Sequence, residues 1–440
     1  VILISIDSLR PDHLGCYGYA RNTSPTLDRL AQEGALFETV WSSTSWTLPA
    51  HAALFTSLPD LVHGCIHGDR WLDGSRYTLA EAFQDAGYHT AGFFSGPYLH
   101  PNYGLAQGFD SYHDCTSYAD QTLAFLQGQA AAGAEPPVVL SCKDITNEIV
   151  LRAVTRWLER APRGPFFLFI HMWDVHYEYI PPAPYDTMFV AERADPDGAG
   201  PHGAAAARHL EYLKSQYDGE IRWTDDTLAK LFARLAERGR FENAVIAVTA
   251  DHGEAFGEHG LHGHHYTLFE EEVRVPLILR YPPAVPAGRR IPELAHLIDL
   301  APTLLSLASL RPMPHALGRD LTPLLAGTGA PWPDTPVLSE LLDPLVTGPQ
   351  LALRTRTWKL AELIGTGRVL MFDLEKDPGE QRPLFGPDAA LSPDEIASLL
   401  ASTAKKLQNA ARLLPVPTTR DTPPIPEMTE AHLRSLGYLK

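Results

Sequence analysis

The segment VILISID, residues 1–7, opens the chain and decides the fold class. Its first six residues form a continuous run of apolar, β-prone side chains, which is typical of a strand buried on both faces. PFFLFIHM (165–172) and NAVIAVTA (243–250) have the same character. Helical segments such as TLAEAFQDAG (78–87) and ITNEIVLRAVTRWLER (145–160) alternate with these strands. This alternation predicts an α/β fold in which helices cover both faces of a mostly parallel central sheet.

The remaining predicted elements continue this pattern up to a proline-rich boundary. Helices are expected at 24–34, 48–58, 204–239 and 299–308, and strands at 35–41, 88–95 and 276–282. PWPDTP (331–336) marks the boundary. Beyond it, 351–363 and 368–378 have hairpin character, and 415–428 reads as a Pro-rich extended arm. We therefore expect a large α/β domain over residues 1–330. A small C-terminal α+β domain with antiparallel strands and that arm should follow over 331–440.

Composition excludes several classes of protein. The chain has 440 residues, 36 Lys+Arg and 53 Asp+Glu, and a net charge of −17. Such an acidic balance argues against binding to nucleic acid or to an anionic membrane surface. No apolar run approaches the roughly 18–20 residues of a membrane span. The four cysteines are too few and too scattered for a disulfide scaffold. The first residue is Val, so the location is open: periplasmic or secreted if a signal peptide was removed, cytoplasmic otherwise.

Side chains that could bind a metal follow three of the predicted strands. In open α/β sheets, ligands bind at the edge where the carboxyl ends of parallel strands meet. The side chains concerned are Asp7, His171, Asp174, His176, Asp251 and His252. Their position predicts a metal-binding site at one edge of the sheet.

The densest signal is the segment DHGEAFGEHGLHGHH, residues 251–265. It holds five of the chain's 19 histidines, and four glycines make it a loop rather than a helix. A solvated His-rich loop is the alternative interpretation. The Asp at a buried strand end favours metal binding instead.

Thr47 lies at or just before the start of the helix predicted over 48–58, shortly after a run of hydroxyl residues (42–45). The N–H groups and the dipole at a helix start favour an anionic oxygen there. An unassisted Thr hydroxyl is a poor nucleophile, and a nearby metal would activate it. The alternative is an ordinary helix cap, which the metal-capable residues nearby make less attractive.

These segments together resemble the sulfatase branch of the alkaline phosphatase superfamily. Ordered motifs over almost the whole chain carry the resemblance: IDSLRPDHLGCYGY (6–19), NTSPTLDRLAQEGALFETV (22–40), TLPAHAALFTSL (47–58), HMWDVHYEYIPP (171–182), TADHGEAFGEHGLHGHHYTLFEEEVRVPLIL (249–279), WKL (358–360) and MFDLEKDPGEQ (371–381). The resemblance implies an alkaline-phosphatase-like fold and ester hydrolysis.

The nucleophile motif departs from the sulfatase pattern. Sulfatases use a Cys or Ser that is oxidised to formylglycine, within C/S-x-P-x-R. Here Thr47 stands at the nucleophile position and His51 at the Arg position. Thr cannot give formylglycine, and no Cys of this chain starts such a pattern. No formylglycine is expected.

Three further departures concern the metal site. The second Asp of the sulfatase pattern is Ser8, the Asp-Asn pair is Asp251-His252, and the active-site Lys is His264. Ca²⁺ prefers oxygen ligands, whereas Zn²⁺ and Mn²⁺ accept imidazole. We therefore expect one or two transition-metal ions, Zn or Mn. A Thr nucleophile with these ligands resembles the superfamily's phosphodiesterases, phosphonate monoester hydrolases and phosphoethanolamine transferases.

The resulting hypothesis assigns a role to each candidate residue. One metal is held by Asp7, Thr47, Asp251 and His252, and the catalytic groups are Thr47, His176 and His264. A second metal or the substrate would contact His176, His264, Asp174, His171 and His259. Substrate contacts are also assigned to His51, Trp46 and Arg10, although His51 could instead be a hydrogen-bonded helix residue, Trp46 a packing residue and Arg10 a structural one.

Charge helps to choose the substrate. A phosphate monoester dianion usually meets an Arg or a full two-metal clamp, and near Thr47 the only obvious cation in a motif is Arg10. A monoanionic small-molecule ester is therefore favoured, first a phosphodiester or phosphonate monoester cleaved through a phospho-Thr47 intermediate. Sulfate-ester hydrolysis through Thr47 is the second reading and a phosphoethanolamine-type transferase the third. A non-catalytic binding module is a fourth alternative, and a homo-oligomer is left open.

Overall fold

The computed structural model describes residues 1–67, 70–116, 145–161, 164–190, 204–327, 329, 331–366, 368–384 and 391–415. Within these ranges the larger sheet has nine strands, in the order β10-β2-β9-β6-β1-β5-β3-β4 with β11 beside β2. Their bounds are β1 Ile2–Ile6, β2 Ala35–Trp41, β3 His89–Phe94, β4 Ser111–Asp114, β5 Phe166–Met172, β6 Ile246–Thr249, β9 Arg274–Arg280, β10 Arg289–Ile291 and β11 Ala295–His296.

The sheet is mostly parallel, which confirms the predicted fold class. β1 lies between β5 and β6 and runs parallel to both, and all five of its residues are buried. β9 is the exception, because it runs antiparallel to both β2 and β6. The central position of β1 explains why its sequence is apolar without alternation.

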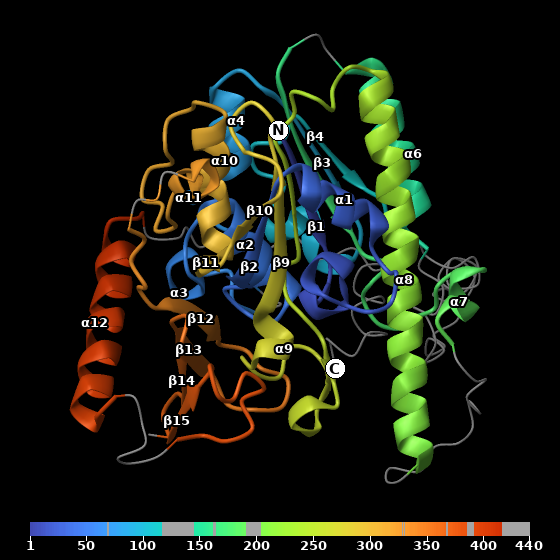
Figure 1. The fold of residues 1–440 in the computed structure, drawn as a ribbon. Helices are drawn as coiled ribbons and strands as arrows, with labels where there is room; N and C mark the ends of the chain where they lie inside the picture. The colour runs from blue at the N-terminus through green and yellow to red at the C-terminus, as the bar shows by residue number, and fades with distance from the viewer. Residues whose placement is uncertain are drawn as a thin grey trace, which may run out of the picture.

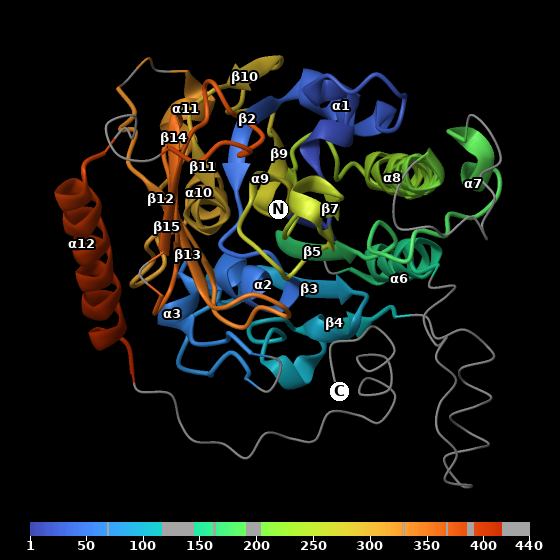
Figure 2. The same cartoon turned by 90° about the horizontal axis from the view of Figure 1, so that it is seen from below.

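Helices cover both faces of the sheet. Figures 1 and 2 show α1 (Pro25–Glu33), α6 (Asn147–Arg160) and α8 (Ala204–Glu237) on one side. The opposite side carries α2 (Thr47–Thr56) and α10 (Leu300–Leu307), together with α4 (Leu79–Asp85). The shorter elements are α3 Asp60–His63, α7 Tyr185–Met188, α9 Glu270–Val273, α11 Thr322–Ala326 and the small hairpin of β7 Ala255–Phe256 and β8 His262–Gly263. Every helix and strand predicted over residues 1–330 has a counterpart here.

A second, antiparallel sheet follows towards the C-terminus. Its order is β12-β13-β14-β15, with bounds Val337–Leu341, Gln350–Arg354, Trp358–Leu363 and Arg368–Asp373. The segments with predicted hairpin character form β13, β14 and β15, whereas β12 was not predicted. Neither was α12 (Pro393–Arg412), which lies outside this sheet in Figure 2 and contacts α3. The domain boundary at 330/331 stays a prediction.

The antiparallel sheet is joined to the segment that precedes α2. The N–H of Glu340 in β12 donates to the carbonyl oxygen of Ser43 at 2.7 Å, and Ser339 Oγ donates to the carbonyl oxygen of Ser42 at 2.6 Å. Lys359 of β14 is fully buried and pairs with Glu380 Oε1 at 2.6 Å, with its ammonium over the Trp41 ring. The C-terminal strands therefore support the loop that leads to Thr47.

Two sequence-based expectations fall wholly or partly outside the described residues. The Pro-rich arm predicted over 415–428 is described only at Pro415. The Pro- and Gly-rich stretch 181–203, whose composition predicts a lid over the pocket, is described only up to Val190. No helix in the described ranges combines the length and apolarity that crossing a bilayer needs.

Candidate active site

Three adjacent strands bring carboxylate and imidazole groups to one edge of the sheet. Asp7 follows β1, His171 lies near the end of β5, and Asp251 follows β6. The Asp7 N–H donates to the Met172 carbonyl at 2.9 Å, which holds the start of the loop against β5. As a result, His171 Nε2 lies 3.2 Å from Asp7 Oδ2. The strand order is what places these three residues side by side, as the sequence predicted.

Asp251 is oriented by backbone donors on one of its oxygens. Its Oδ1 accepts from the N–H of Ser8 at 3.2 Å and from the N–H of His252 at 2.9 Å. Ser8 has the left-handed φ of 55°, which turns its N–H towards this carboxylate. The next residue after His252 is Gly253, and a larger residue would not fit there, because its Cβ would lie 2.1 Å from the carbonyl oxygen of Glu271. Asp251 Oδ2 is buried and has no hydrogen-bond partner among the described residues.

His252 turns its Nε2 atom towards both carboxylates. Its Nδ1–H donates to the Gly253 carbonyl at 2.9 Å, so the Nε2 lone pair faces the cluster. That nitrogen lies 3.5 Å from Asp251 Oδ2 and 3.7 Å from Asp7 Oδ1. Burial opposes the charged form of His252, but Asp251 and Asp7 outweigh it and raise the pKa of the imidazole. An electropositive partner, a proton or a metal ion, is therefore favoured at this nitrogen.

The residues of this cluster fit a divalent metal ion. Ligand atoms of Asp7, Asp251 and His252 all lie within 4.8 Å of one another, and all three residues are fully buried. Tetrahedral coordination at about 2.0–2.1 Å separates neighbouring ligand atoms by about 3.3 Å. The distances of 3.5 and 3.7 Å from His252 Nε2 are close to that value. The otherwise unpartnered Asp251 Oδ2 is the atom that an ion would satisfy.

Thr47 points its hydroxyl into the same cluster. It is the first residue of α2, and Trp46 before it makes no side-chain cap. Thr47 Oγ1 lies 3.3 Å from His252 Nε2 and 3.4 Å from Asp7 Oδ2. The structure thus brings together the four residues Asp7, Thr47, Asp251 and His252 that the sequence singled out, at a helix start.

His264 and His176 extend the cluster on the side of His252. The His252 and His264 rings are 4.3 Å apart between centroids, and the His264 and His176 rings 4.9 Å. Trp173 stacks on His176 at 4.0 Å. Burial lowers the pKa of His176 to about 3 and that of His264 well below its usual value. Both side chains are therefore neutral imidazoles.

Glu254 lies next to His264, and it was not among the site residues predicted from the sequence. His264 Nδ1–H donates to Glu254 Oε1 at 3.1 Å, and Glu254 is fully buried. Burial raises the pKa of Glu254 to about 7, while His252 and a hydrogen bond from Tyr179 oppose that rise. The usable signal was its place two residues after His252, inside the histidine-rich segment.

Three predicted site residues are not brought into the cluster, and those expectations need correction. Asp174 accepts from Thr146 at both N and Oγ1, from Asn147 N and from Trp223 Nε1, so it holds the start of α6. His259 pairs with Glu271 and stacks on Phe269. Arg10 pairs with Asp12 and Glu258. Asp174 and His259 belong to neither group of clustered metal-ligand atoms among the described residues.

Trp46 and His51 are both buried near Thr47. Trp46 is 1% exposed and stacks on His265 at 4.3 Å. His51 is fully buried, donates from Nδ1 to the Thr47 carbonyl at 2.8 Å, and has its Nε2 3.0 Å from Ser5 Oγ. His51 therefore supports Thr47 from the protein interior, and the substrate contacts expected of Trp46 and His51 stay predictions.

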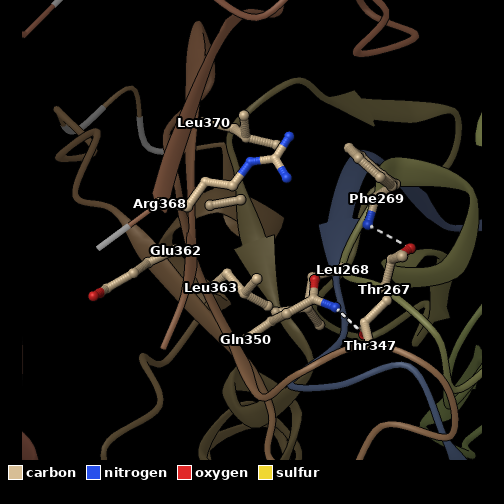
Figure 3. Close-up of a pocket in the computed structure, with 10 residues that line it drawn as sticks. Thr267, Leu268, Phe269, Thr347, Gln350, Glu362, Leu363, Arg368 and Leu370 are labelled. Atoms are coloured by element: carbon tan, nitrogen blue, oxygen red, sulfur yellow. Dashed lines mark hydrogen bonds between the residues drawn. The ribbon is translucent and has the colours of Figure 1, made fainter. Parts of the chain in front are cut away.

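A separate pocket lies between residues 267–269 and the antiparallel sheet. It has a volume of about 240 Å³, and Figure 3 shows Arg368 extending from the sheet towards Phe269 on the opposite wall. Its lining residues are Thr267, Leu268, Phe269, Thr347, Gln350, Ala361, Glu362, Leu363, Arg368 and Leu370. None of them is a member of the cluster around Thr47, so this pocket is distinct from the candidate active site.

Family comparison identifies the chain's relatives. The family model named Sulfatase matches residues 1–310, well over half of the chain. The chain belongs to the sulfatase family. A second model, N-sulphoglucosamine sulphohydrolase, C-terminal, matches residues 257–410. Since family members are hydrolases, this sulfatase-family protein is a hydrolase that acts on sulfate or phosphate esters.

Individual relatives and structures agree with this assignment. The N-acetylglucosamine-6-O-sulfatase of Bacteroides thetaiotaomicron is 23% identical over 93% of this chain and 87% of its own length. BT4656, solved in complex with its substrate D-glucosamine-2-N,6-O-disulfate, has a TM-score of 0.75 at 20% identity and covers 93% of this chain and 98% of its own. The phosphonate monoester hydrolase of Agrobacterium radiobacter has a TM-score of 0.72 at 24% identity, with coverages of 94% and 95%. The sulfatase-like branch of the alkaline phosphatase superfamily, which the sequence motifs suggested, is confirmed.

Proposed function

We propose that this sulfatase-family protein hydrolyses monoanionic esters, first of all phosphodiesters or phosphonate monoesters, with Thr47 as the nucleophile. The observation that carries the proposal is the position of Thr47 Oγ1, 3.4 Å from Asp7 Oδ2 and 3.3 Å from His252 Nε2 at the start of α2. A Thr side chain has no route to formylglycine, so the hydroxyl itself must act.

The cofactor we propose is a divalent transition metal, Zn or Mn, held by Asp7, Asp251 and His252 with Thr47 alongside. Two carboxylates and one imidazole suit these ions better than Ca²⁺, which prefers oxygen ligands. When bound, such an ion would lower the pKa of a neighbouring hydroxyl and polarise the ester.

The residues of the chain then carry a two-step displacement. Thr47 Oγ attacks phosphorus in line, so the Oγ–P bond forms while the bond from phosphorus to the leaving oxygen breaks. The proton that the Thr47 hydroxyl loses ends on the leaving oxygen. His176 and His264, whose Nδ1–H groups donate to the Tyr177 carbonyl and to Glu254, can relay it through Nε2. Water then attacks phospho-Thr47, and cleavage of the Oγ–P bond restores the hydroxyl.

The charge of the site favours a monoanion. The two neighbouring histidines are neutral, and Arg10 is occupied by Asp12 and Glu258. The carboxylates of Asp7 and Asp251 would offset the charge of one bound dication. A phosphate monoester dianion would therefore find less compensation here than a diester.

A sulfate ester is the second candidate substrate, and the names of the relatives favour it. The family model and the N-acetylglucosamine-6-O-sulfatase relative both concern sulfate esters. A sulfate monoester carries a single negative charge, so the charge argument does not separate it from a phosphodiester. The reaction would proceed through Thr47 in the same way.

A paired assay tests the proposal. Metal-loaded enzyme is compared on bis-p-nitrophenyl phosphate, p-nitrophenyl phenylphosphonate and p-nitrophenyl sulfate, each with Thr47→Ala as control and with added glycerol as an acceptor. We expect the highest kcat/KM on the first two, and Thr47→Ala should abolish it. Faster sulfate turnover would move the sulfate ester to first place. Transfer to glycerol would identify a transferase, and turnover that survives Thr47→Ala would refute the nucleophile.

A further inference from the structure

The separate pocket described above arises from the way in which the antiparallel sheet packs. Neighbouring side chains of a strand point to opposite faces, so Lys359, Ala361 and Leu363 of β14 share one face. At one end of that face the ammonium of Lys359 lies 5.8 Å from the centroid of the Phe269 ring. At the other end, the face and residues 267–269 enclose the pocket of about 240 Å³ that Figure 3 shows.

The lining that comes from β14 and β15 is apolar apart from one side chain. Leu363 pairs across the two strands with Arg368, and Ala361 pairs with Leu370. These four side chains therefore share a face, and all four residues line the pocket. Glu362 alternates to the opposite face, and Figure 3 shows its carboxylate extending away from the pocket. The charge that these strands present to the pocket is therefore the cation of Arg368.

The other polar side chains of the lining are engaged with the protein. Thr347 Oγ1 donates to the Tyr266 carbonyl at 2.6 Å. Gln350 Nε2 donates to the same carbonyl at 3.0 Å and to Thr347 Oγ1 at 2.7 Å. Thr267 Oγ1 donates to Glu272 Oε1 at 2.5 Å. The donors of these three side chains are used, so the body of a ligand would meet mainly carbon.

Arg368 differs from these groups. Its side chain is exposed, and its guanidinium forms no hydrogen bond or ion pair with any described residue. A guanidinium is always charged and offers five N–H donors that match the oxygens of an anionic group. A cation of this kind beside apolar walls is complementary to an anion that carries an apolar body.

Exposed apolar side chains continue from the pocket onto the surface. Ile364 follows the lining residue Leu363 and is 39% exposed, and Val346 precedes the lining residue Thr347 and is 71% exposed. The Ile364 N–H donates to the Pro349 carbonyl at 2.9 Å, which holds the two segments together. Grouped exposed apolar side chains favour an apolar ligand at this place.

We infer that this pocket binds a small organic anion with an aryl or alkyl body, whose anionic group pairs with Arg368 while the body lies against Phe269, Leu363 and Leu370. The pocket volume of about 240 Å³ is below the roughly 300 Å³ at which pockets for drug-sized ligands begin, so the ligand is small. Since the pocket lies apart from the cluster around Thr47, the inference does not depend on which ester the protein hydrolyses.

Calorimetric titration of the full chain tests the inference, with 4-phenylbutyrate as the probe and 4-phenylbutyramide as its uncharged counterpart. Wild type should bind one equivalent of the carboxylate, about three- to fivefold more tightly than the amide, which is the range of a solvent-accessible ion pair. Arg368→Gln should remove that preference. Ala361→Phe should abolish binding of both probes, because the ring fills the pocket. Arg382→Gln removes an exposed arginine outside the pocket and is the matched control, which should bind like wild type.

Each contrary result overturns the inference. Wild type that binds no carboxylate would do so, as would wild type that binds the carboxylate and the amide equally. Wild-type affinity in a folded Ala361→Phe would place the probe elsewhere, and an undiminished preference in Arg368→Gln would remove the anion from Arg368. Circular dichroism establishes that each variant is folded. Arg368→Gln changes an exposed side chain, so it tests the site even if Ala361→Phe does not fold.

Discussion

The Nδ1 atom of His51 lies 2.8 Å from the carbonyl oxygen of Thr47, one helical turn earlier in α2. The helix thus ties the backbone of Thr47 to a side chain in the protein interior. His51 also contacts Ser5 of β1, so one residue connects Thr47 to the central strand. This connection sets the first prediction.

We expect His51→Ala to destabilise the metal-free protein by about 2–3 kcal/mol, because it leaves buried polar groups of Thr47 and Ser5 without their partner. His51→Gln keeps a donor and an acceptor and should lose less. Urea denaturation of the stripped proteins measures both. Equal stability of wild type and His51→Ala would show that these contacts contribute nothing.

Replacement of the nucleophile should separate chemistry from folding. Thr47→Ala should lower kcat by at least about 10³-fold with little effect on the melting temperature, because the hydroxyl that attacks the ester is gone. Thr47→Ser keeps that hydroxyl and should retain measurable activity. Mass spectrometry after acid quenching should find the phosphoryl group on the peptide that contains Thr47. A modified peptide elsewhere would refute the assignment.

Glu254 should act through His264, since its carboxylate accepts the Nδ1–H of that ring. We expect Glu254→Ala to lower kcat by about 10–100-fold, in the range seen when such supporting contacts are lost. Glu254→Gln keeps an acceptor oxygen and should be milder. Steady-state kinetics with each variant checks the difference. Similar losses in both would mean that charge, rather than ring orientation, is what Glu254 provides.

Metal removal should destabilise the protein as well as inactivate it. Asp7 and Asp251 are buried next to each other, and a bound dication would compensate their charge. A chelator should therefore lower the melting temperature, because an ion that binds only the folded state stabilises it. Zn²⁺ or Mn²⁺ should restore the melting temperature and Ca²⁺ should not. Full restoration by Ca²⁺ alone would contradict the proposed metal.

The junction of α3 and β12 should make stability depend on pH. Burial, reinforced by the nearby Asp60 carboxylate, raises the pKa of Glu340 to about 8. The folded state therefore holds a proton that the unfolded chain releases near its ordinary value of 4.5. This contribution to stability is complete below about pH 4.5 and is lost as the pH rises towards 8.

Glu340→Gln mimics the protonated acid at every pH. We expect its melting temperature to fall less than that of wild type between pH 5 and pH 8, and to exceed that of wild type at pH 8. Glu148→Gln removes an exposed carboxylate and serves as the control. Parallel curves for wild type and Glu340→Gln would show that Glu340 does not carry this dependence.

Part of the candidate site could be predicted from the sequence because it follows from the order of the strands in the sheet. Asp7, His171 and Asp251 follow or end apolar runs, and parallel strands must bring such ends to one edge. Thr47 could be added because a helix start is readable from the sequence. These relationships are local along the chain or follow from one topological rule.

The site residues that were predicted wrongly have hydrogen-bond partners far away along the chain. Asp174 lies two residues before His176, yet its donors are Thr146 and Asn147 at the start of α6 and Trp223 on α8. His259 lies in the histidine-rich segment, but Glu271 and the Glu380 carbonyl hold it elsewhere. Hydrophobic periodicity carries no information about such partners. The same reason explains why β12, whose role is to hold residues 42 and 43, was not recognised.

That last contact has a consequence for how the protein is made. Ser42 and Ser339 are 297 positions apart, so the support of the nucleophile loop is translated long after the loop itself. A nascent chain that has already exposed Thr47 to solvent still lacks the strand that completes its surroundings. We therefore expect that a product terminated before β12 would contain Asp7, Thr47, Asp251 and His252 but lack the strand that holds the loop before Thr47 in place.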